Sequence, residues 1–366
     1  MKKLEEVNPF KSTVVKTDFG TITTLLTESG ISEHGSISFE SKTLLANYVY
    51  AKNETYKLVY TVVDKEGKHE SFAENDGILP MLFLSPENEA YVSVVPYDPD
   101  KELEISIPVF NRESIDLPKG SRPFVGKFIG TTKLFSIFYD VDLWSDTKPD
   151  KLLAVEFKNG AIKKKHNVKI SLPRNNKIFI ADNEIHLLAN DGKSWLHRQI
   201  DEKGNVVRER KIQPTKNCFS EIFNLSFNEN SYIWCAKGGE ISLEIVSPNG
   251  KCESKKLADI GGEFYNTWKP VKISADTYVA TFNGDLGNGW FTIKNDQILE
   301  LFYSKGEKGY KNLLTNEVLQ MNNENLCISS VNKTVENGYA VVFYPMTERG
   351  IKNKELIILN REITMM

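Results

Sequence analysis

Alanine is scarce in this chain of 366 residues: it occurs 13 times, against 20 Phe, 14 Tyr and 5 Trp. Alanine is the strongest helix former, whereas aromatic and β-branched side chains favour strands. The shortage argues against helical bundles, helical solenoids, coiled coils and most α/β nucleotide enzymes, and it predicts an all-β protein. The proportions of hydrophobic (40%) and charged (26%) residues are those of an ordinary folded chain.

Long apolar runs, closely spaced cysteines and an excess of positive charge are also absent. No run of 18 apolar residues occurs, so no membrane-spanning helix is expected. A net charge of −3 argues against nucleic acid as a partner. The scattered cysteines form no C-x-x-C pair, which disfavours zinc ribbons and thioredoxin-like chemistry and predicts structural thiols at Cys218, Cys235, Cys252 and Cys327.

The first residues, MKKLEEVNPF, contain no apolar segment of the kind found in secretory signals. A cytoplasmic protein is therefore expected. A secreted protein whose signal has been removed remains the alternative.

A short apolar strand, a tight polar turn and a stronger apolar strand recur along the chain, as in KIFIADNEIHLLA. The first apolar residues of the second strands are spaced by 43 to 51 residues, with a mean of 47. A second set of turns, which includes Gly160, Gly204 and Gly250, keeps nearly the same period. The positions that define the period are Leu44, Tyr91, Leu134, Ile185, Tyr232, Tyr278 and Leu326.

Each period has room for four short strands, and four-stranded units repeated every 40–50 residues or so are typical of β-propeller blades. The sequence predicts a seven-bladed β-propeller of four-stranded antiparallel blades over residues 35–366. Residues 1–34 are expected to supply strands that close or cap the ring, within a single domain overall. A pair of β-sandwiches is the alternative, but it predicts no constant period. A short helical turn is expected at Tyr310–Leu314.

Binding sites of propellers usually lie where several loops converge at the channel mouth. The longest predicted loop between a second and a third strand contains Asp140, Asp142, Trp144 and Asp146. Its carboxylates suggest weak Ca²⁺ ligands, but Trp144 occupies the place of a third ligand, and a solvated acidic loop is the simpler interpretation. Asp98, in the preceding blade, carries the same ambiguity.

Two further segments combine aromatic and acidic residues. The glycine-rich stretch around Asp285 and Trp290 lacks the Lys-Ser/Thr and the helix of a phosphate loop, so it is predicted to be a hairpin loop in which Trp290 offers a stacking face. The connection that contains Glu263 and Trp268 suits a sugar ring, whereas packing between blades is the alternative role for its aromatic residues.

The segment Leu188–Trp195, LANDGKSW, resembles the Asp-box repeat of sialidase-like (BNR) propellers, S-x-D-x-G-x-T-W. In that family the box stabilises a turn, and catalysis uses an arginine triad with a Tyr/Glu pair and an Asp acid. The resemblance leaves only Arg122 and Arg174 as arginines on the predicted binding face, with Arg112 less well placed. No catalytic residue can be carried over from it.

The five histidines occur singly and without metal-ligand spacing, and no Ser or Cys lies in a nucleophile context. The sequence therefore favours a monomeric, non-catalytic binding protein for a protein or glycan ligand, without a cofactor. The alternative is a carbohydrate-active enzyme of glycoside hydrolase or lyase type. It would use carboxylates from several blades, such as Asp98, Asp142 and Asp285.

Overall fold

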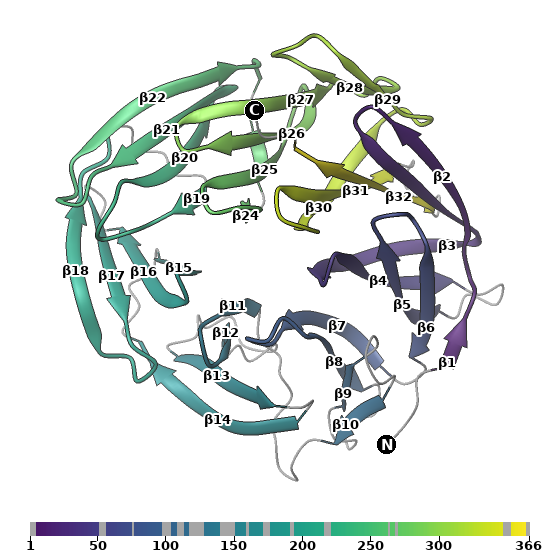
Figure 1. The fold of residues 1–366 in the computed structure, drawn as a ribbon, viewed down its shortest axis with the longest axis horizontal. Helices are drawn as coiled ribbons and strands as arrows, with labels where there is room; N and C mark the ends of the chain where they lie inside the picture. The colour runs from purple at the N-terminus through teal and green to yellow at the C-terminus, as the bar shows by residue number, and fades with distance from the viewer. Residues whose placement is uncertain are drawn as a thin grey trace.

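The computed structural model describes residues 5–50, 56–74, 77–96, 104–107, 113–116, 128–139, 151–158, 161–170, 176–190, 194–215, 221–262, 264–267, 270–346 and 353–363. Strands and turns make up this part of the chain, and no helix occurs in it, so it contains none that would cross a membrane. The strands form sheets arranged in a ring around a central axis (Figure 1). The predicted all-β class is confirmed.

Four separate sheets each contain four antiparallel strands that follow one another in the chain. In the sheets where it is clearest, the first strand lies near the axis and the fourth at the rim (Figure 1). Antiparallel neighbours need only tight turns between them, which is why a short repeat suffices for each sheet. The strands are β7 (Gly77–Leu84), β8 (Ala90–Pro96), β9 (Glu104–Ile107), β10 (Glu113–Asp116); β11 (Phe128–Thr131), β12 (Ser136–Tyr139), β13 (Lys151–Lys158), β14 (Ala161–Lys169); β15 (Asn176–Ala181), β16 (Glu184–Asn190), β17 (Trp195–Ile200), β18 (Val206–Ile212); and β19 (Glu221–Asn224), β20 (Ser231–Lys237), β21 (Glu240–Val246), β22 (Cys252–Asp259).

The remaining strands form two larger sheets, of seven and nine strands. The seven-stranded sheet contains β23 (Phe264–Thr267), β24 (Val271–Lys272), β25 (Thr277–Gly284), β26 (Gly287–Lys294), β27 (Gln297–Ser304), β28 (Gly309–Asn312) and β29 (Val318–Gln320). The nine-stranded sheet contains β1 (Glu5–Val7), β2 (Lys11–Thr17), β3 (Gly20–Phe39), β4 (Lys42–Tyr50), β5 (Tyr56–Asp64), β6 (His69–Glu74), β30 (Leu326–Lys333), β31 (Gly338–Pro345) and β32 (Asn353–Glu362). Four sheets have the predicted blade pattern, whereas the predicted number of seven blades is not confirmed.

Strand β3 joins the two ends of the chain. Its first part pairs with β32, from Thr21 opposite Asn360 to Leu26 opposite Glu355, and its last part pairs with β4. β2 forms a hairpin with β3, and β1 pairs with the outer strand β6. The N-terminal strands thus add hydrogen-bond partners to both halves of the nine-stranded sheet.

Apolar side chains fill the spaces between neighbouring sheets. Trp234 and Leu243, from β20 and β21, pack with Phe282 and Phe291 from β25 and β26, and all four are fully buried. Because a sheet in the ring is covered on both faces, its middle strands are apolar almost throughout rather than at alternate positions. The aromatic surplus of the sequence is therefore used largely in packing between sheets.

The segment that begins at Tyr310 differs from its prediction. Tyr310 lies in β28, which pairs with β27 and β29, so the predicted helical turn is wrong. Burial alternates along the strand, with Tyr310 and Asn312 buried and Lys311 exposed, as a pleated strand requires. The amide oxygen of Asn312 accepts a hydrogen bond from Leu314 N at 3.0 Å and so ends the strand in a turn.

Candidate functional site

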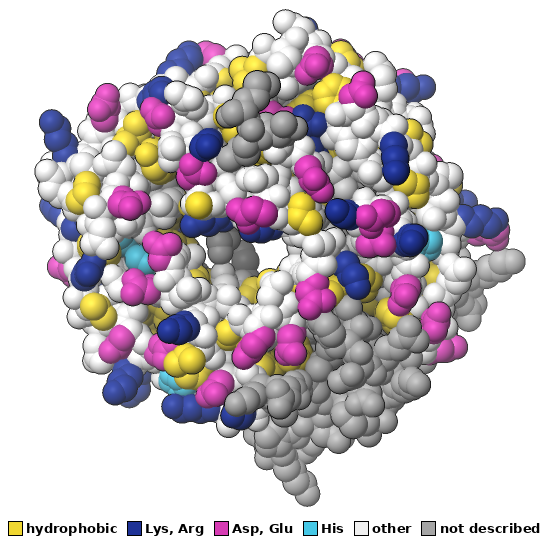
Figure 2. All heavy atoms as spheres, in the orientation of Figure 1, with side chains coloured by type: hydrophobic (Ala, Val, Ile, Leu, Met, Phe, Trp, Pro, Cys, Tyr) yellow, Lys and Arg dark blue, Asp and Glu magenta, His cyan; other side chains and the backbone are white. Residues whose placement is uncertain are grey.

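A cavity of about 550 Å³ lies at the centre of the ring. Figure 2 shows the opening between side chains at this position. Strands from five different sheets contribute to the wall, namely β11, β15, β19, β24 and β30. This cavity is called the axial cavity below.

The lining residues show at which end of the ring the cavity lies. Thr131, Ala181 and Asn224 are the last residues of β11, β15 and β19, and Lys272 is the last residue of β24. The carboxyl ends of these first strands gather at one end of the ring, where the turns between first and second strands also lie. The axial cavity is therefore at the opposite end from the loops that the sequence predicted as the binding face.

The turn Asp182-Asn183 forms part of the cavity wall. Both residues have positive φ, 49° and 64°, as the two central residues of a type I′ hairpin turn require. Asp and Asn tolerate this conformation better than most residues, so the backbone explains why they occur here. Their side chains give the wall a carboxylate and an amide.

Tyr278 separates the cavity from the space behind it. Its side chain is buried, and the ammonium group of Lys272 lies 5.9 Å from the centre of its ring. Burial raises the pKa of the Tyr278 phenol, and the negative charge of Asp182 raises it further. The phenol therefore stays protonated and is a neutral hydroxyl at physiological pH.

The rest of the wall combines apolar and polar side chains. Phe179, Ile222 and Val331 supply apolar surface, while the hydroxyl of Ser330 lies 2.5 Å from that of Ser36 on β3. Asp182 and Lys272 are the charged members of the lining, and their charges cancel. An apolar wall with a few polar groups is typical of ligand cavities.

Two buried histidines lie in the sheet that carries Asp182. His186 Nδ1 lies 2.9 Å from His197 Nε2, and Arg210 donates from Nε to His197 Nδ1 at 3.1 Å. Since Nδ1 of His197 is the acceptor, its proton is on Nε2, which donates to His186. Burial lowers the pKa of His186 to about 4, and burial with the neighbouring His186 and Arg210 lowers that of His197 to about 2.

Both histidines are thus neutral at physiological pH, and both are buried (3% and 0% exposed). They pack against Phe179 and Phe227 in stacked arrangements. The pair is a hydrogen-bonded part of the core behind the cavity wall. Within the described residues, no group of three His, Cys, Asp or Glu side chains is placed to hold a metal ion.

Most residues that the sequence singled out lie outside the described part of the chain. Asp285 is described, and it is exposed in the turn between β25 and β26, at the end of the ring away from the axial cavity. The structure therefore does not bring Asp285 together with the cavity. The predicted residues outside the described ranges are Asp98, Arg122, Asp140, Asp142, Trp144, Asp146, Arg174, Glu263 and Trp268.

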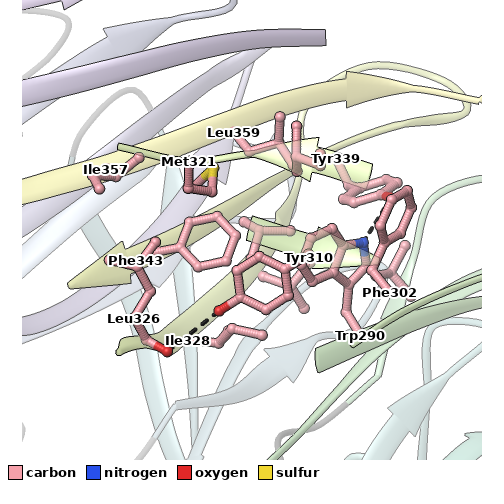
Figure 3. Packing of buried hydrophobic residues seen from close by; sticks show 14 of the residues in the cluster. Trp290, Phe302, Tyr310, Met321, Leu326, Ile328, Tyr339, Phe343, Ile357 and Leu359 are labelled. Atoms are coloured by element: carbon pink, nitrogen blue, oxygen red, sulfur yellow. Dashed lines mark hydrogen bonds between the residues drawn. The ribbon is translucent and has the colours of Figure 1, made fainter. Parts of the chain in front are cut away.

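Trp290 is not a ligand-stacking surface, and that prediction is wrong. Its side chain is fully buried in the cluster of Figure 3, where the indole stacks on Phe302 at 4.7 Å. Its Nε1 donates to the hydroxyl of Tyr339 at 3.0 Å, which in turn donates to Glu300 at 3.1 Å. Glu300 is paired with Arg361, so the indole belongs to a buried polar network between strands.

The segment that resembles an Asp box joins β16 to β17. Asn190 and Trp195 are opposite each other in the pairing of these strands, and Trp195 is buried. Residues 191–193 are outside the described ranges, and the BNR resemblance is unconfirmed.

Cys235 is disulfide-bonded, so the prediction of four structural thiols is wrong. Cys252 and Cys327 are free thiols, as predicted, and Cys218 lies outside the described residues. The sequence missed the disulfide because strand patterns show apolar surroundings, in which a thiol and a disulfide are equally at home.

The axial cavity was also missed from the sequence. Asp182 and Asn183 were recognised only as a tight turn, and Tyr278 only as the start of a strand. The recurrence of that turn was the available signal, because turns repeated once per blade must meet at one end of a ring.

Comparisons with known proteins define the class of fold. No family model matches the chain, and no curated protein matches it. Among solved structures, the β-propeller domain of the Trilobed protease from Pyrococcus furiosus, described as having an open velcro topology, is 9% identical with a TM-score of 0.51, covering 92% of this chain and 97% of that one. Prolyl oligopeptidase B from Galerina marginata, bound to a hydrolysis and macrocyclization substrate, is 10% identical with a TM-score of 0.51.

The alignment with the Galerina enzyme covers 86% of this chain and 46% of that one. A catalytically inactive variant of virginiamycin B lyase from Staphylococcus aureus, in complex with quinupristin, is 14% identical with a TM-score of 0.49, covering 97% of this chain and 100% of that one. The two structures with TM-scores of 0.51 are 9% and 10% identical, so their likeness concerns the fold alone, and the protein is a β-propeller.

Proposed function

We propose that this β-propeller is a non-catalytic binding protein that holds a protein segment or a glycan in its axial cavity. The cavity itself carries the proposal. Its volume of about 550 Å³ falls within the range of roughly 300–1,000 Å³ that is common for ligand sites. Groups from five sheets line it, and such convergence suits recognition of one ligand from several sides.

The chemistry of the wall supports binding rather than catalysis. The described groups with the most strongly lowered pKa values, His186 and His197, are enclosed in the core and do not line the cavity. The cavity wall itself has one acid, Asp182, in the turn between β15 and β16, and one base, Lys272, at the end of β24 in another sheet. General acid–base catalysis needs such groups positioned against a reacting bond, usually with matched pKa values.

We also propose that the ring has seven blades. The described residues form seven apolar clusters, and each joins two successive units of the ring. In this assignment the nine-stranded sheet consists of two blades that meet at β3, and residues 1–34 supply the closing strands.

For the compartment we propose the secreted alternative, on the ground of the cysteine chemistry. A disulfide persists in oxidising surroundings and is rare in the cytosol of most organisms. The bond at Cys235 supports the secreted alternative over the cytoplasmic one.

A pair of variants tests the axial cavity. Thr131→Trp places an indole in the cavity wall, whereas Val206→Trp places the same group on the outer strand β18, where Val206 is 52% exposed. The wild-type protein, immobilised, is offered a glycan array and an extract of the source cells. We expect a ligand that binds the wild type and Val206→Trp but is lost, at least tenfold in affinity, from Thr131→Trp.

Two results would contradict the proposal. One is a ligand retained equally by Thr131→Trp, which would place binding away from the cavity. The other is turnover in a panel of glycosidase and lyase substrates, which would establish the carbohydrate-active enzyme instead.

A further inference from the structure

A second pocket lies beside the axial cavity. Its volume is about 270 Å³, and Asn224 and Tyr278 line both spaces. Glu229 and Asn230, in the turn that ends at β20, and Asp276, in the turn before β25, form its outer wall. The pocket therefore shares part of its wall with the axial cavity and lies outward of it, between two neighbouring sheets at the same end of the ring. It is called the outer pocket below.

The outer pocket is lined mainly by polar groups. Ala275 and Ile293 are its aliphatic residues, and the remaining seven lining residues are Asn224, Glu229, Asn230, Tyr232, Asp276, Tyr278 and Asn295. An apolar peptide side chain would find little matching surface there. Carboxamide groups supply both donors and acceptors, and carboxylates supply acceptors, which together suit the hydroxyl groups of a sugar.

Charge narrows the choice of ligand. Glu229 and Asp276 line the outer pocket, and no Lys or Arg is among the lining residues. Lys294 lies outside the lining, with its Nζ 3.8 Å from a carboxylate oxygen of Asp276. Together with Asp182 and Lys272, the linings of the two spaces have three acids and one base, and Lys294 offsets one of the acids from outside the lining. This balance gives a phosphate or carboxylate no net attraction, whereas a neutral, hydroxyl-rich chain needs none.

Tyr278 lies at the junction of the two spaces. Its phenol is protonated because burial raises its pKa, and the residue is 7% exposed, so it offers both spaces a small edge rather than an open ring face. The carboxamide of Asn224, which lines both spaces as well, adds a donor and an acceptor for sugar hydroxyls at this point. A ligand that extends past this junction would contact both spaces.

We infer that the outer pocket is a second subsite for a neutral oligosaccharide whose first sugar occupies the axial cavity. The inference rests on the proposed binding function and adds to it the ligand class and a direction of binding. Successive sugars lie from the axial cavity past Tyr278 and Asn224 to Asn230.

Chain-length dependence tests the second subsite. Titration calorimetry with neutral chito-, cello-, malto-, manno- and xylo-oligosaccharides, from one to six sugars, is expected to give one series whose affinity rises at least tenfold once the chain fills both spaces. Asn230→Ala is expected to abolish most of that rise and to leave the affinity for the shortest ligand unchanged. Asn228→Ala is the matched control, because Asn228 lies in the same turn, bonds Arg208 at 3.0 Å and does not line the pocket.

The outcomes separate this inference from the proposed function. Binding without a gain from chain length, or an equal loss in both Asn variants, refutes the second subsite and leaves the axial cavity as a binding site. The glycan is excluded as the ligand if no neutral oligosaccharide binds and a protein from the extract binds the wild type but not Thr131→Trp. Binding of a short lysine peptide that weakens with added salt would replace it by a cationic ligand, because a neutral ligand has little salt dependence.

Discussion

The buried histidine pair predicts a loss of stability at mildly acidic pH. In the unfolded chain both side chains titrate near their ordinary value of 6.5, whereas in the folded protein the pKa of His186 is about 4 and that of His197 about 2. Below pH 6.5 the unfolded state therefore binds more protons than the folded one. The free energy of unfolding is unaffected by the pair above that pH and falls as pH is lowered toward 4.

The size of the effect follows from the number of protons. One proton bound only by the unfolded state changes the free energy of unfolding by about 1.4 kcal/mol per pH unit. A histidine that stays neutral in the folded protein thus lowers the free energy of unfolding by about 2.5 kcal/mol between pH 6.5 and 4.5, and two such histidines lower it by about 5 kcal/mol. A loss of this size is a large fraction of the stability of an ordinary domain.

Urea unfolding at several pH values between 7.5 and 4.5 measures the effect. The double variant His186→Leu, His197→Gln removes both titrating groups and keeps an acceptor for Arg210. Carboxylates contribute to the pH dependence of both proteins, so the quantity compared is the slope of the free energy of unfolding against pH. We expect the wild type to lose stability more steeply than the variant by about 1.4–2.7 kcal/mol per pH unit.

His69→Gln is the matched control for the loss of a histidine outside the buried pair, since His69 is partly exposed on β6. NMR of the folded wild type provides an independent readout, in which the His186 and His197 ring signals should not titrate above pH 5. Equal slopes for the wild type and the double variant, or ring signals that titrate near pH 6.5, would refute the neutral buried pair.

Three further predictions concern stability and covalent structure. Gly289→Ala is expected to destabilise the protein by about 3 kcal/mol or more in urea unfolding, because a Cβ there would lie 2.1 Å from a backbone oxygen. The control Gly35→Ala, with no atom within 4 Å of its Cβ, should cost less than about 1 kcal/mol. Similar losses in the two variants would contradict the close packing at Gly289. Arg361→Ala should cost about 3 kcal/mol by leaving the buried Glu300 without its cationic partner, with the Tyr339 hydroxyl as its remaining donor, and a loss under about 1 kcal/mol would show that the pair contributes little. Thiol labelling of the denatured, unreduced protein, followed by mass spectrometry, should modify two of the four cysteines. After reduction, labelling should modify all four. Labelling of all four cysteines before reduction would exclude the disulfide at Cys235.

The repeat period predicted the strands well because it reflects spacing that every blade must share. Ile185, Tyr232 and Tyr278 each lie one residue into the second strand of a sheet. Leu326 and Leu134 are exceptions: Leu326 begins β30, the end strand of its sheet, and Leu134 is 54% exposed in the turn before β12.

The site was harder to predict because loop lengths are ambiguous in the sequence. The sequence predicts a hairpin loop around Asp285, and the hairpin is there, but its turn is shorter than the glycine-rich stretch because strand pairing continues to Gly284 and resumes at Gly287. Gly289 is a glycine because of the close backbone of Phe302, rather than because the chain turns there. The axial cavity is assembled from residues about 200 positions apart, from Gly130 to Val331, and no local motif reports such a site.

The pairing of β3 with β32 has a mechanical consequence. Thr21 is opposite Asn360, so a force applied to the C-terminus acts first on the bond pair at that end and then on the next, toward Leu26 and Glu355. Bonds loaded one at a time yield at lower force than bonds loaded together. β32 is also paired along its other side with β31, from Gly338 opposite Glu362 to Phe343 opposite Ile357, so peeling the last strand from its end has to break two ladders together. The second ladder therefore protects the closure of the ring against a pull on the C-terminus.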